Sequence, residues 1–299
     1  MVMGGLRGFE YAEPTSLKEA FSILGRNEGA QILAGGTDLI LGMRERKFEP
    51  RVVLNIKKIP DLNRIQIDEH GRLRIGALVT INALDSSQAI RTAFPMLADA
   101  AHNLGSYQIR NRATVGGNLC NASPAADTAP PLIALGAIAK IAGPQQERLV
   151  KLEDFFVGPG KTVLSKDEVL VEVDVPSPPK GSWSAYLKLG PRNAMDIATV
   201  NAALMFALSE QECVDARIVL GSVSPIPMRS RRAEAEIRGK PIHDNTVGKA
   251  AEAASEECSP ISDVRASAEY RREMVRVVVR RLFRNALDSK SMKSGGKAA

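Results

Sequence analysis

Two double-glycine segments, about eighty positions apart, constrain this chain more than any other feature of its sequence. The first covers residues 34–40 and reads Ala-Gly-Gly-Thr-Asp-Leu-Ile, and the second covers residues 114–118 and reads Thr-Val-Gly-Gly-Asn. A backbone that carries no side chains lets several N–H groups approach an anion closely. One glycine pair is ordinary turn chemistry. Two such segments, each after a short apolar run, predict a clamp for a diphosphate.

The second segment continues as Asn-Leu-Cys-Asn-Ala-Ser-Pro-Ala-Ala-Asp over residues 118–127. Together the two segments resemble the FAD-binding subunits of molybdenum hydroxylases, a family that includes the medium subunit of carbon monoxide dehydrogenase and the FAD domain of xanthine dehydrogenase. The resemblance covers nearly the whole chain, from Phe9 to about Leu287. The second segment is the more specific one, because it fixes residue identities over about fourteen positions.

The resemblance implies an α+β fold. It consists of a two-subdomain FAD-binding fold of the PCMH/vanillyl-alcohol-oxidase type, followed by a C-terminal antiparallel three-stranded sheet with a helical bundle. FAD would lie extended in the cleft between the two subdomains. Because the first glycine segment contains no histidine, we expect FAD to be bound noncovalently.

The resemblance also assigns roles to particular residues. The backbone of residues 33–40 would hold the diphosphate from the first subdomain, and Thr114, Gly116 and Gly117 would hold it from the second. The cofactor-binding positions implied in this way are Leu33, Ala34, Gly35, Gly36, Thr37, Asp38, Leu39, Ile40, Leu104, Tyr107, Thr114, Gly116, Gly117, Asn118, Cys120, Asn121, Asp127, Leu170 and Lys188. No catalytic residue and no metal ligand is expected on this chain.

Several of these positions would contact defined parts of the cofactor. Asp127 resembles the family's aspartate that binds the ribityl or ribose hydroxyls, and Leu170 resembles its apolar contact on the adenine side. Lys188 resembles a lysine that reaches the isoalloxazine, where a cation would stabilise the negative charge of the reduced ring. Leu104 or Tyr107 would pack on the ring, and because Leu104 matches an aromatic position in xanthine dehydrogenase, the stacking residue stays open.

The same residues have structural alternatives. The hydroxyl groups of Thr37 and Thr114 can donate to phosphate oxygens or close their own turns. Asp127 can act as a helix N-cap before the run that starts at Pro130, since aspartate favours that position. Lys188 can be a solvated lysine on a strand.

The cysteines do not form a metal or disulfide pattern. Cys120, Cys213 and Cys258 lie far apart and make no Cys-x-x-Cys pair, which argues against a disulfide framework and against an iron–sulfur or zinc site. Cys120 and Asn121 fall where the family's chain passes the flavin ring, and they can equally be buried packing.

Periodicity predicts a three-part chain. We expect an N-terminal subdomain over 1–60, a second subdomain over 61–176, a proline-rich linker over 177–182, a C-terminal domain over 183–288 and a disordered tail over 289–299. A capping-box pattern predicts a helix of about ten residues from residue 17. Further helices are expected over 92–104, 130–136, 228–238, 247–255 and 267–287. Strands are expected over 31–34, 52–56, 64–67, 73–78, 137–142, 169–175, 185–189, 202–208 and 216–223.

The net charge of +6 is concentrated at the C-terminal end. From Tyr270 onward, nine basic residues face two acidic ones, a sum of +7, so the preceding residues sum to −1. No reading element for nucleic acid accompanies this basic segment, so nucleic acid is not an expected partner. The segment is either a solvated helix face or a docking surface for an acidic partner subunit or for anionic lipid, and the second option includes peripheral membrane association.

The resemblance implies that the chain is the flavoprotein component of a molybdenum-containing hydroxylase or dehydrogenase, which accepts electrons and passes them to a terminal acceptor. A large subunit would carry the molybdenum cofactor, a small subunit would carry 2Fe–2S clusters, and the complex would be a dimer of heterotrimers, that is, a heterohexamer. No apolar stretch is long enough to span a bilayer and the start lacks a secretory signal, so a cytoplasmic location is expected. The alternatives are a self-contained flavin oxidoreductase and a cofactor-free scaffold.

Overall fold

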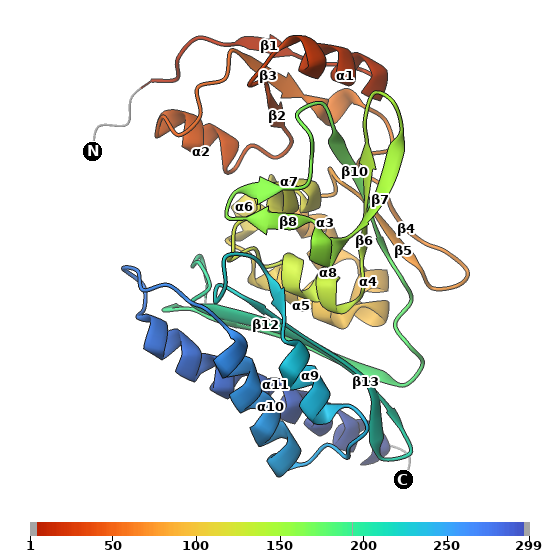
Figure 1. Cartoon of the computed structure of the whole chain (residues 1–299). Helices are drawn as coiled ribbons and strands as arrows, with labels where there is room; N and C mark the ends of the chain where they lie inside the picture. The colour runs from red at the N-terminus through yellow and green to blue at the C-terminus, as the bar shows by residue number, and fades with distance from the viewer. Residues whose placement is uncertain (1–4, 193, 296–299) are drawn as a thin grey trace.

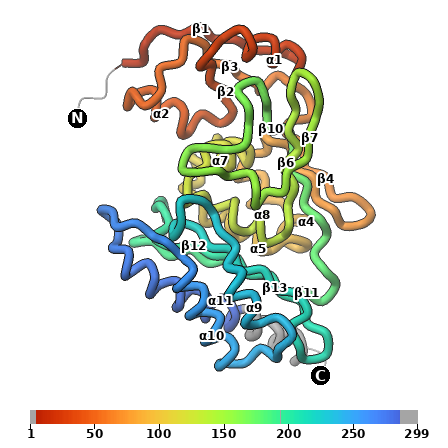
Figure 2. The backbone as a smooth tube through the Cα atoms, viewed as in Figure 1, coloured from red at the N-terminus to blue at the C-terminus, as the bar shows by residue number. Residues whose placement is uncertain are grey.

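Three hydrophobic cores hold the molecule together, and two of them combine residues from neighbouring units. The structure, a computed structural model, describes residues 5–192 and 194–295. The N-terminal unit (residues up to 60) lies at one end of the molecule, the middle unit (61–176) follows, and the C-terminal unit (from 183) lies at the other end (Figures 1 and 2). These bounds are the predicted ones and stay a prediction.

The N-terminal unit is a small parallel sheet with two helices. Its elements are β1 (Glu10–Ala12), α1 (Leu17–Arg26), β2 (Gln31–Leu33), α2 (Leu39–Arg44), β3 (Val52–Asn55) and the 3-10 helix η1 (Ile56–Lys58). The strand order is β1-β3-β2, with both pairs parallel. The Ser16 side chain accepts from the Glu19 N–H and starts α1 where the capping-box pattern predicts it. Ala20 and Leu24 of α1 pack on Leu54 of β3 in the core of this unit.

The middle unit is an antiparallel sheet with short helices on one side. Its sheet has the order β4-β5-β10-β6-β7, formed by β4 (Ile65–Ile67), β5 (Leu73–Gly76), β6 (Ile138–Ala142), β7 (Glu147–Lys151) and β10 (Val169–Val175). Its other elements are α3 (Ile81–Ser86), α4 (Gln88–Ala93), α5 (Pro95–Asn103), α6 (Tyr107–Arg110), α7 (Val115–Cys120), α8 (Ala129–Ala134), η2 (Leu152–Asp154), β8 (Phe156–Gly158) and β9 (Lys161–Thr162). Gly71 has φ +77° in the hairpin turn between β4 and β5, as expected for a turn glycine.

The sequence prediction of this unit was wrong in two places. The single helix expected over 92–104 is two helices, α4 and α5, because Pro95 has no N–H to continue α4 and instead begins the next helix. The second glycine segment is a short helix, α7, and not a loop. Its start is set by Thr114, whose side chain accepts from the Gly117 N–H at 3.0 Å.

The C-terminal unit is a four-stranded antiparallel sheet covered by three helices. Its elements are β11 (Ser182–Leu189), β12 (Val200–Ser209), β13 (Glu212–Gly221), β14 (Met228–Arg229), α9 (Arg231–Ile237), α10 (Asp244–Glu257) and α11 (Ala268–Gly295). The strand order is β11-β12-β13-β14. Three strands were predicted, and the fourth is a two-residue edge strand, too short for a period-2 pattern to reveal it.

Both faces of this sheet are buried, which explains the nearly unbroken apolar run of β12. Tyr186, Ala203 and Val219 belong to the core of the middle unit, whereas alternate positions such as Leu204 and Phe206 belong to the core beneath α9–α11. Figure 1 shows the sheet between the middle-unit helices and the blue helices α10 and α11. The sheet is therefore shared by the two units.

Helix boundaries in this unit also differ from the predictions. Helix α9 begins at Arg231 and not at residue 228, because residues 228–229 pair with β13. Helix α11 continues to Gly295, past the predicted start of the tail at residue 289. No glycine or proline interrupts the sequence between Arg271 and Ser294, so the helix meets no breaker before Gly295. Residues 296–299 of the predicted tail lie outside the described residues.

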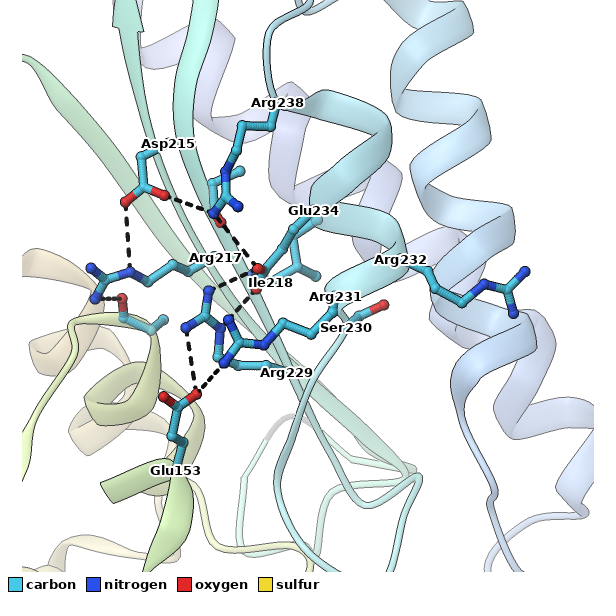
Figure 3. Close-up of polar contacts among 12 residues, drawn as sticks. Glu153, Asp215, Arg217, Ile218, Arg229, Ser230, Arg231, Arg232, Glu234 and Arg238 are labelled. Atoms are coloured by element: carbon cyan, nitrogen blue, oxygen red, sulfur yellow. Dashed lines mark hydrogen bonds and ion pairs between the residues drawn. The ribbon is translucent and has the colours of Figure 1, made fainter. Parts of the chain in front are cut away.

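Charged side chains join the C-terminal unit to the middle unit at a second place (Figure 3). Glu234 of α9 is almost fully buried, and its carboxylate accepts from Arg229 at 2.9 and 2.7 Å. Glu153 of η2 accepts from Arg229 at 3.4 Å and from Arg231 at 2.8 Å. One carboxylate of the middle unit therefore contacts two arginines of the C-terminal unit.

Candidate functional site

The first glycine segment leaves β2 and turns into α2 with its N–H groups unused. Gly36 has φ +81°, a conformation that glycine adopts without strain. Within the described part of the chain, no acceptor receives a hydrogen bond from the N–H groups of Gly35, Gly36, Thr37, Asp38 or Leu39. Five consecutive free donors on a half-exposed turn are a suitable seat for a diphosphate.

The second glycine segment is tied to the chain through its backbone. The N–H groups of Val115 and Gly116 donate to the carbonyls of Val79 and Ala77 at 2.9 and 2.8 Å. The Gly117 N–H is taken by the Thr114 side chain. Most backbone donors at this site therefore come from the first segment, while the second brings small residues and the Thr114 hydroxyl, whose hydrogen stays free to donate.

The two glycine segments meet. A Cβ on Gly35 would lie 2.0 Å from the carbonyl oxygen of Arg112, directly before the second segment, and a Cβ on Gly117 would lie 4.0 Å from the Cβ of Ala34. Lys57 adds a positive charge here, since its Nζ donates to the Ala34 carbonyl at 2.9 Å. Burial, and next the charge of Arg112, lower the pKa of Lys57. An anion bound between the segments would relieve the repulsion between these two cations.

Asp127 lies at the centre of a buried polar network. The Tyr186 hydroxyl donates to its Oδ1 at 2.8 Å, and the Asn201 Nδ2 lies 3.4 Å from the same oxygen. Lys188 Nζ lies 2.8 Å from Oδ2 and also donates to the carbonyl of Asn103 at 3.0 Å. A carboxylate offers about four acceptor positions, and three are occupied here, which leaves one on Oδ2 for a further donor.

The electrostatics of this network follow from burial. Burial raises the pKa of Asp127, and the neighbouring ammonium of Lys188 opposes that rise. Burial raises the pKa of Tyr186 well above its usual value, so the phenol stays a neutral donor. The side chains of Asp127 and Lys188 are each only 9% exposed, which makes their ion pair a desolvated one.

Other predicted residues lie near the glycine segments and the Asp127 network. Asn118 Oδ1 accepts from the Thr128 hydroxyl at 2.6 Å and so ties α7 to the segment that carries Asp127. Burial raises the pKa of the Cys120 thiol to about 12, so this half-buried cysteine is protonated and unreactive at neutral pH. Asn121 is half-buried beside it, at the end of α7.

The three residues predicted to pack against the flavin ring or the adenine differ in exposure. Leu104 and Leu170 are buried in the core of the middle unit, at 7% and 3% exposure. Tyr107 is 59% exposed at the start of α6. The network reaches this region, because the Asn103 carbonyl that accepts from Lys188 directly precedes Leu104. Which of Leu104 and Tyr107 packs on the ring stays open.

Sequence reasoning missed Tyr186, Asn201 and Lys57. The first two had a detectable signal, because Tyr186 precedes Lys188 by two positions on a predicted strand and therefore shares its face. Asn201 is a lone amide in an apolar strand and pairs with Lys188 across β11 and β12. Lys57 gave no signal, since its contact with Ala34 depends on tertiary structure.

The described residues contain neither a metal-binding cluster nor a helix that could cross a membrane. No cluster of histidine, cysteine, aspartate or glutamate in the described ranges could hold a metal ion. None of the helices, over the residues that the structure describes, combines the length and hydropathy required to cross a membrane.

Comparison with known families accounts for both halves of the chain. Residues 7–178 match the family described as "FAD binding domain in molybdopterin dehydrogenase". Residues 185–286 match the "CO dehydrogenase flavoprotein C-terminal domain".

Individual proteins match over nearly their full length. The chain is 35% identical over 279 residues to the carbon monoxide dehydrogenase medium chain of Hydrogenophaga pseudoflava, covering 93% of this chain and 96% of that one. It is 32% identical over 288 residues to the xanthine dehydrogenase FAD-binding subunit of Escherichia coli O157:H7, covering 96% and 97%. A solved carbon monoxide dehydrogenase from Hydrogenophaga pseudoflava superposes with a TM-score of 0.92 at 34% identity, covering 95% of this chain and 99% of that one.

Proposed function

The chain belongs to the FAD-binding subunits of molybdenum hydroxylases, and from this premise we propose that it is the electron-transfer flavoprotein of such a complex. Bound FAD would supply the redox chemistry, taking electrons from the 2Fe–2S clusters of a partner subunit and passing them to a terminal acceptor. The chain's own task is to hold, orient and enclose the cofactor. It needs no acid or base of its own for substrate oxidation, which would occur on a separate molybdenum subunit.

The observation that carries this proposal is the meeting of the two glycine segments. Residues 35–39 carry five free N–H groups. Two positively charged residues, Lys57 and Arg112, lie next to this segment. A diphosphate there would receive hydrogen bonds from the first segment and from the hydroxyl of Thr114 in the second. Gly35 and Gly117 keep the backbone open to the anion, because side chains at these positions would fill the space between the segments.

The Asp127 network supports a place for the remainder of the cofactor. The free acceptor position on its Oδ2 can take one hydroxyl of the ribityl chain. Lys188 would direct its charge toward the flavin ring from the C-terminal unit, as the resemblance implies. Since Asp127 comes from the middle unit and Lys188 from β11, the site requires both units.

The partners and location are inferred from the family. A relative named as the medium chain of a carbon monoxide dehydrogenase implies larger and smaller companion chains. We infer a molybdenum-binding large subunit and a 2Fe–2S small subunit, arranged as a dimer of heterotrimers in the cytoplasm. The described basic residues of α11 that are exposed, such as Arg280, Arg281 and Arg284, are candidates for contact with an acidic partner or with anionic lipid.

An absorbance spectrum of the purified chain tests the proposal. We expect flavin bands after addition of FAD, and heat should release FAD in stoichiometric amount because the cofactor is noncovalent. An Asp127→Ala variant should lose much of its FAD while remaining folded; full flavin occupancy in this variant would contradict the role of Asp127. A wild-type chain that stays colourless with FAD would favour the cofactor-free scaffold, whereas oxidation of an organic substrate by the isolated chain would favour a self-contained oxidoreductase.

A further inference from the structure

The two oxygens of the Asp127 carboxylate have different kinds of donor. The two neutral donors both contact Oδ1, at 2.8 and 3.4 Å, and the cation contacts Oδ2 at 2.8 Å. A carboxylate held at both oxygens by donors from two strands cannot rotate about its Cβ–Cγ bond without losing a hydrogen bond. The neutral donors therefore hold the plane of the carboxylate in one orientation relative to Lys188.

The backbone brings these three side chains to one face of the sheet. Tyr186 and Lys188 are two positions apart on β11, and Asn201 of β12 is the registered partner of Lys188. This face packs against the middle unit, so Tyr186 is 8% exposed and Asn201 is fully buried. A buried hydroxyl that donates to a carboxylate makes one of the stronger hydrogen bonds in a protein.

Besides its contact with Asp127, Lys188 makes a second polar contact. Its Nζ donates to the carbonyl of Asn103 at the end of α5, so the ammonium is held between Asp127 Oδ2 and this carbonyl. If Oδ1 lost its neutral donors, the carboxylate could turn and present both oxygens to the ammonium. The ammonium would then leave the position set by Asn103.

We propose that Tyr186 is a positioning residue of the flavin site, which holds Asp127 so that Lys188 keeps its charge at a fixed place beside the ring. This inference rests on the proposed function and adds a residue to it. The phenol acts through Asp127 and Lys188, and no contact of Tyr186 with the cofactor is needed. Because burial raises the pKa of the Tyr186 phenol well above its usual value, the phenol remains a donor at neutral pH.

The test uses the full chain reconstituted with FAD and a Tyr186→Phe variant, which keeps the ring and removes only the hydroxyl. FAD should bind about tenfold more weakly, as expected when a buried hydrogen bond to a charged group is lost. The midpoint potential of the bound flavin should fall, because a displaced ammonium stabilises the negative charge gained on reduction less well. The absorbance bands of the bound flavin, which depend on the surroundings of the ring, provide a second readout of the position of the charge.

A double-mutant cycle with Lys188→Gln separates positioning from general stability. Once the cation is absent, Tyr186→Phe should cause no further fall in potential. An equal fall in both backgrounds, or an unchanged potential and FAD affinity in Tyr186→Phe alone, would overturn the inference. Tyr270→Phe is the matched control, since Tyr270 is 49% exposed on α11, and this change should leave both quantities unaltered.

A second variant covers the case in which Tyr186→Phe does not fold. Asn201→Ser removes the longer hydrogen bond to Oδ1, and the potential should again fall, by a smaller amount. An unchanged potential in this variant would then overturn the inference. Failure of the wild-type chain to bind FAD is a distinct result, because it would remove the proposed function itself.

Discussion

Gly35 is a position at which a single added methyl group would have a severe consequence. Its added Cβ would lie 2.0 Å from a backbone oxygen of Arg112 and 3.1 Å from the Cα of Ala113, and neither atom belongs to a flexible side chain. The two glycine segments would have to separate. Gly35 is thus required by the approach of the segments, and its identity follows from tertiary structure.

We therefore expect Gly35→Ala to weaken FAD binding strongly and to lower the free energy of unfolding by about 1–3 kcal/mol through overpacking. Gly25→Ala is the control, because nothing lies within 4 Å of its added Cβ on helix α1. That variant should be unchanged or stabilised by about 0.5–1 kcal/mol. Titration with FAD and denaturant unfolding of both variants provide the comparison; equal FAD affinity in the two would show that the segments do not form the site.

At the residue scale, the sequence predicted candidate site residues but not the contacts between them. The glycine segments were predicted from their own residues, Asp127 and Lys188 were predicted from a resemblance, and the structure brings Asp127 and Lys188 within 2.8 Å of each other. Their direct ion pair was not predicted, because no local pattern links residues 61 positions apart in the chain. The assignment of these residues to FAD stays a prediction.

At the scale of elements, the strands and long helices were predicted well, whereas several short helices were not. Strand β10 occupies residues 169–175 and helix α1 starts at residue 17, as the patterns indicate. The short helices α3, α6 and α7 escaped prediction, since four to six residues are too few for a helical period to be recognised. Each of these helices nevertheless begins at an N-cap residue that is visible in the sequence. The side chains of Thr80, Ser106 and Thr114 each accept a hydrogen bond from an N–H three residues later.

The connection between α10 and α11 is held by one buried arginine. Arg271 donates to the carbonyls of Thr199 and Ser222 at 2.7 and 3.1 Å and to Asp263 at 2.8 Å. Burial tends to raise the pKa of Asp263, but hydrogen bonds from the Arg265 N–H and from Arg271 outweigh this effect and lower the pKa to about 2. The carboxylate therefore stabilises the fold while it is charged.

Asp263→Asn should lower the free energy of unfolding at neutral pH by about 1 kcal/mol, after allowance for solvent screening of a partly exposed pair. A depressed carboxyl pKa contributes stability above the unfolded value of 3.8, and this contribution is lost as pH falls toward about 2. The difference between wild type and variant should thus be constant above about pH 5 and should shrink as pH falls toward 2. Urea unfolding at several pH values measures it, and a difference as large at pH 2 as at neutral pH would refute the assignment.

At the scale of the whole molecule, the family comparison and the structure agree on the fold class. The prediction of a mixed helix and sheet fold, with an FAD-binding domain followed by a flavoprotein C-terminal domain, is confirmed, although the C-terminal sheet has four strands and not the three predicted. The sequence could not show that one sheet serves two cores, because an apolar run such as β12 is equally consistent with a strand or helix buried inside a single core.

Arg229, which contacts Glu153 of the middle unit and Glu234 of its own unit, gives a prediction at this scale. Glu234→Gln removes the carboxylate that pairs with Arg229 and leaves a guanidinium that is only 13% exposed, with Glu153 as its remaining carboxylate at 3.4 Å. Loss of one partner of a buried pair costs about 3–5 kcal/mol. Glu256→Gln, which breaks a surface pair with Arg232, should change stability little. Thermal unfolding of both variants tests this, and similar melting temperatures would contradict the importance of the buried pair.

The shared sheet has a consequence for how the molecule opens. Because β11–β13 complete the cores on both sides, the middle and C-terminal units cannot separate without exposing both cores at once. In native-state hydrogen exchange, amides of β10 and β12 should therefore exchange as one cooperative unit. The core under β1–β3 is completed in the same way by Val169 and Val171 of β10, so the amides of β1–β3 should exchange together with this unit. The cofactor's distance from a docked redox partner would then be set by one rigid body.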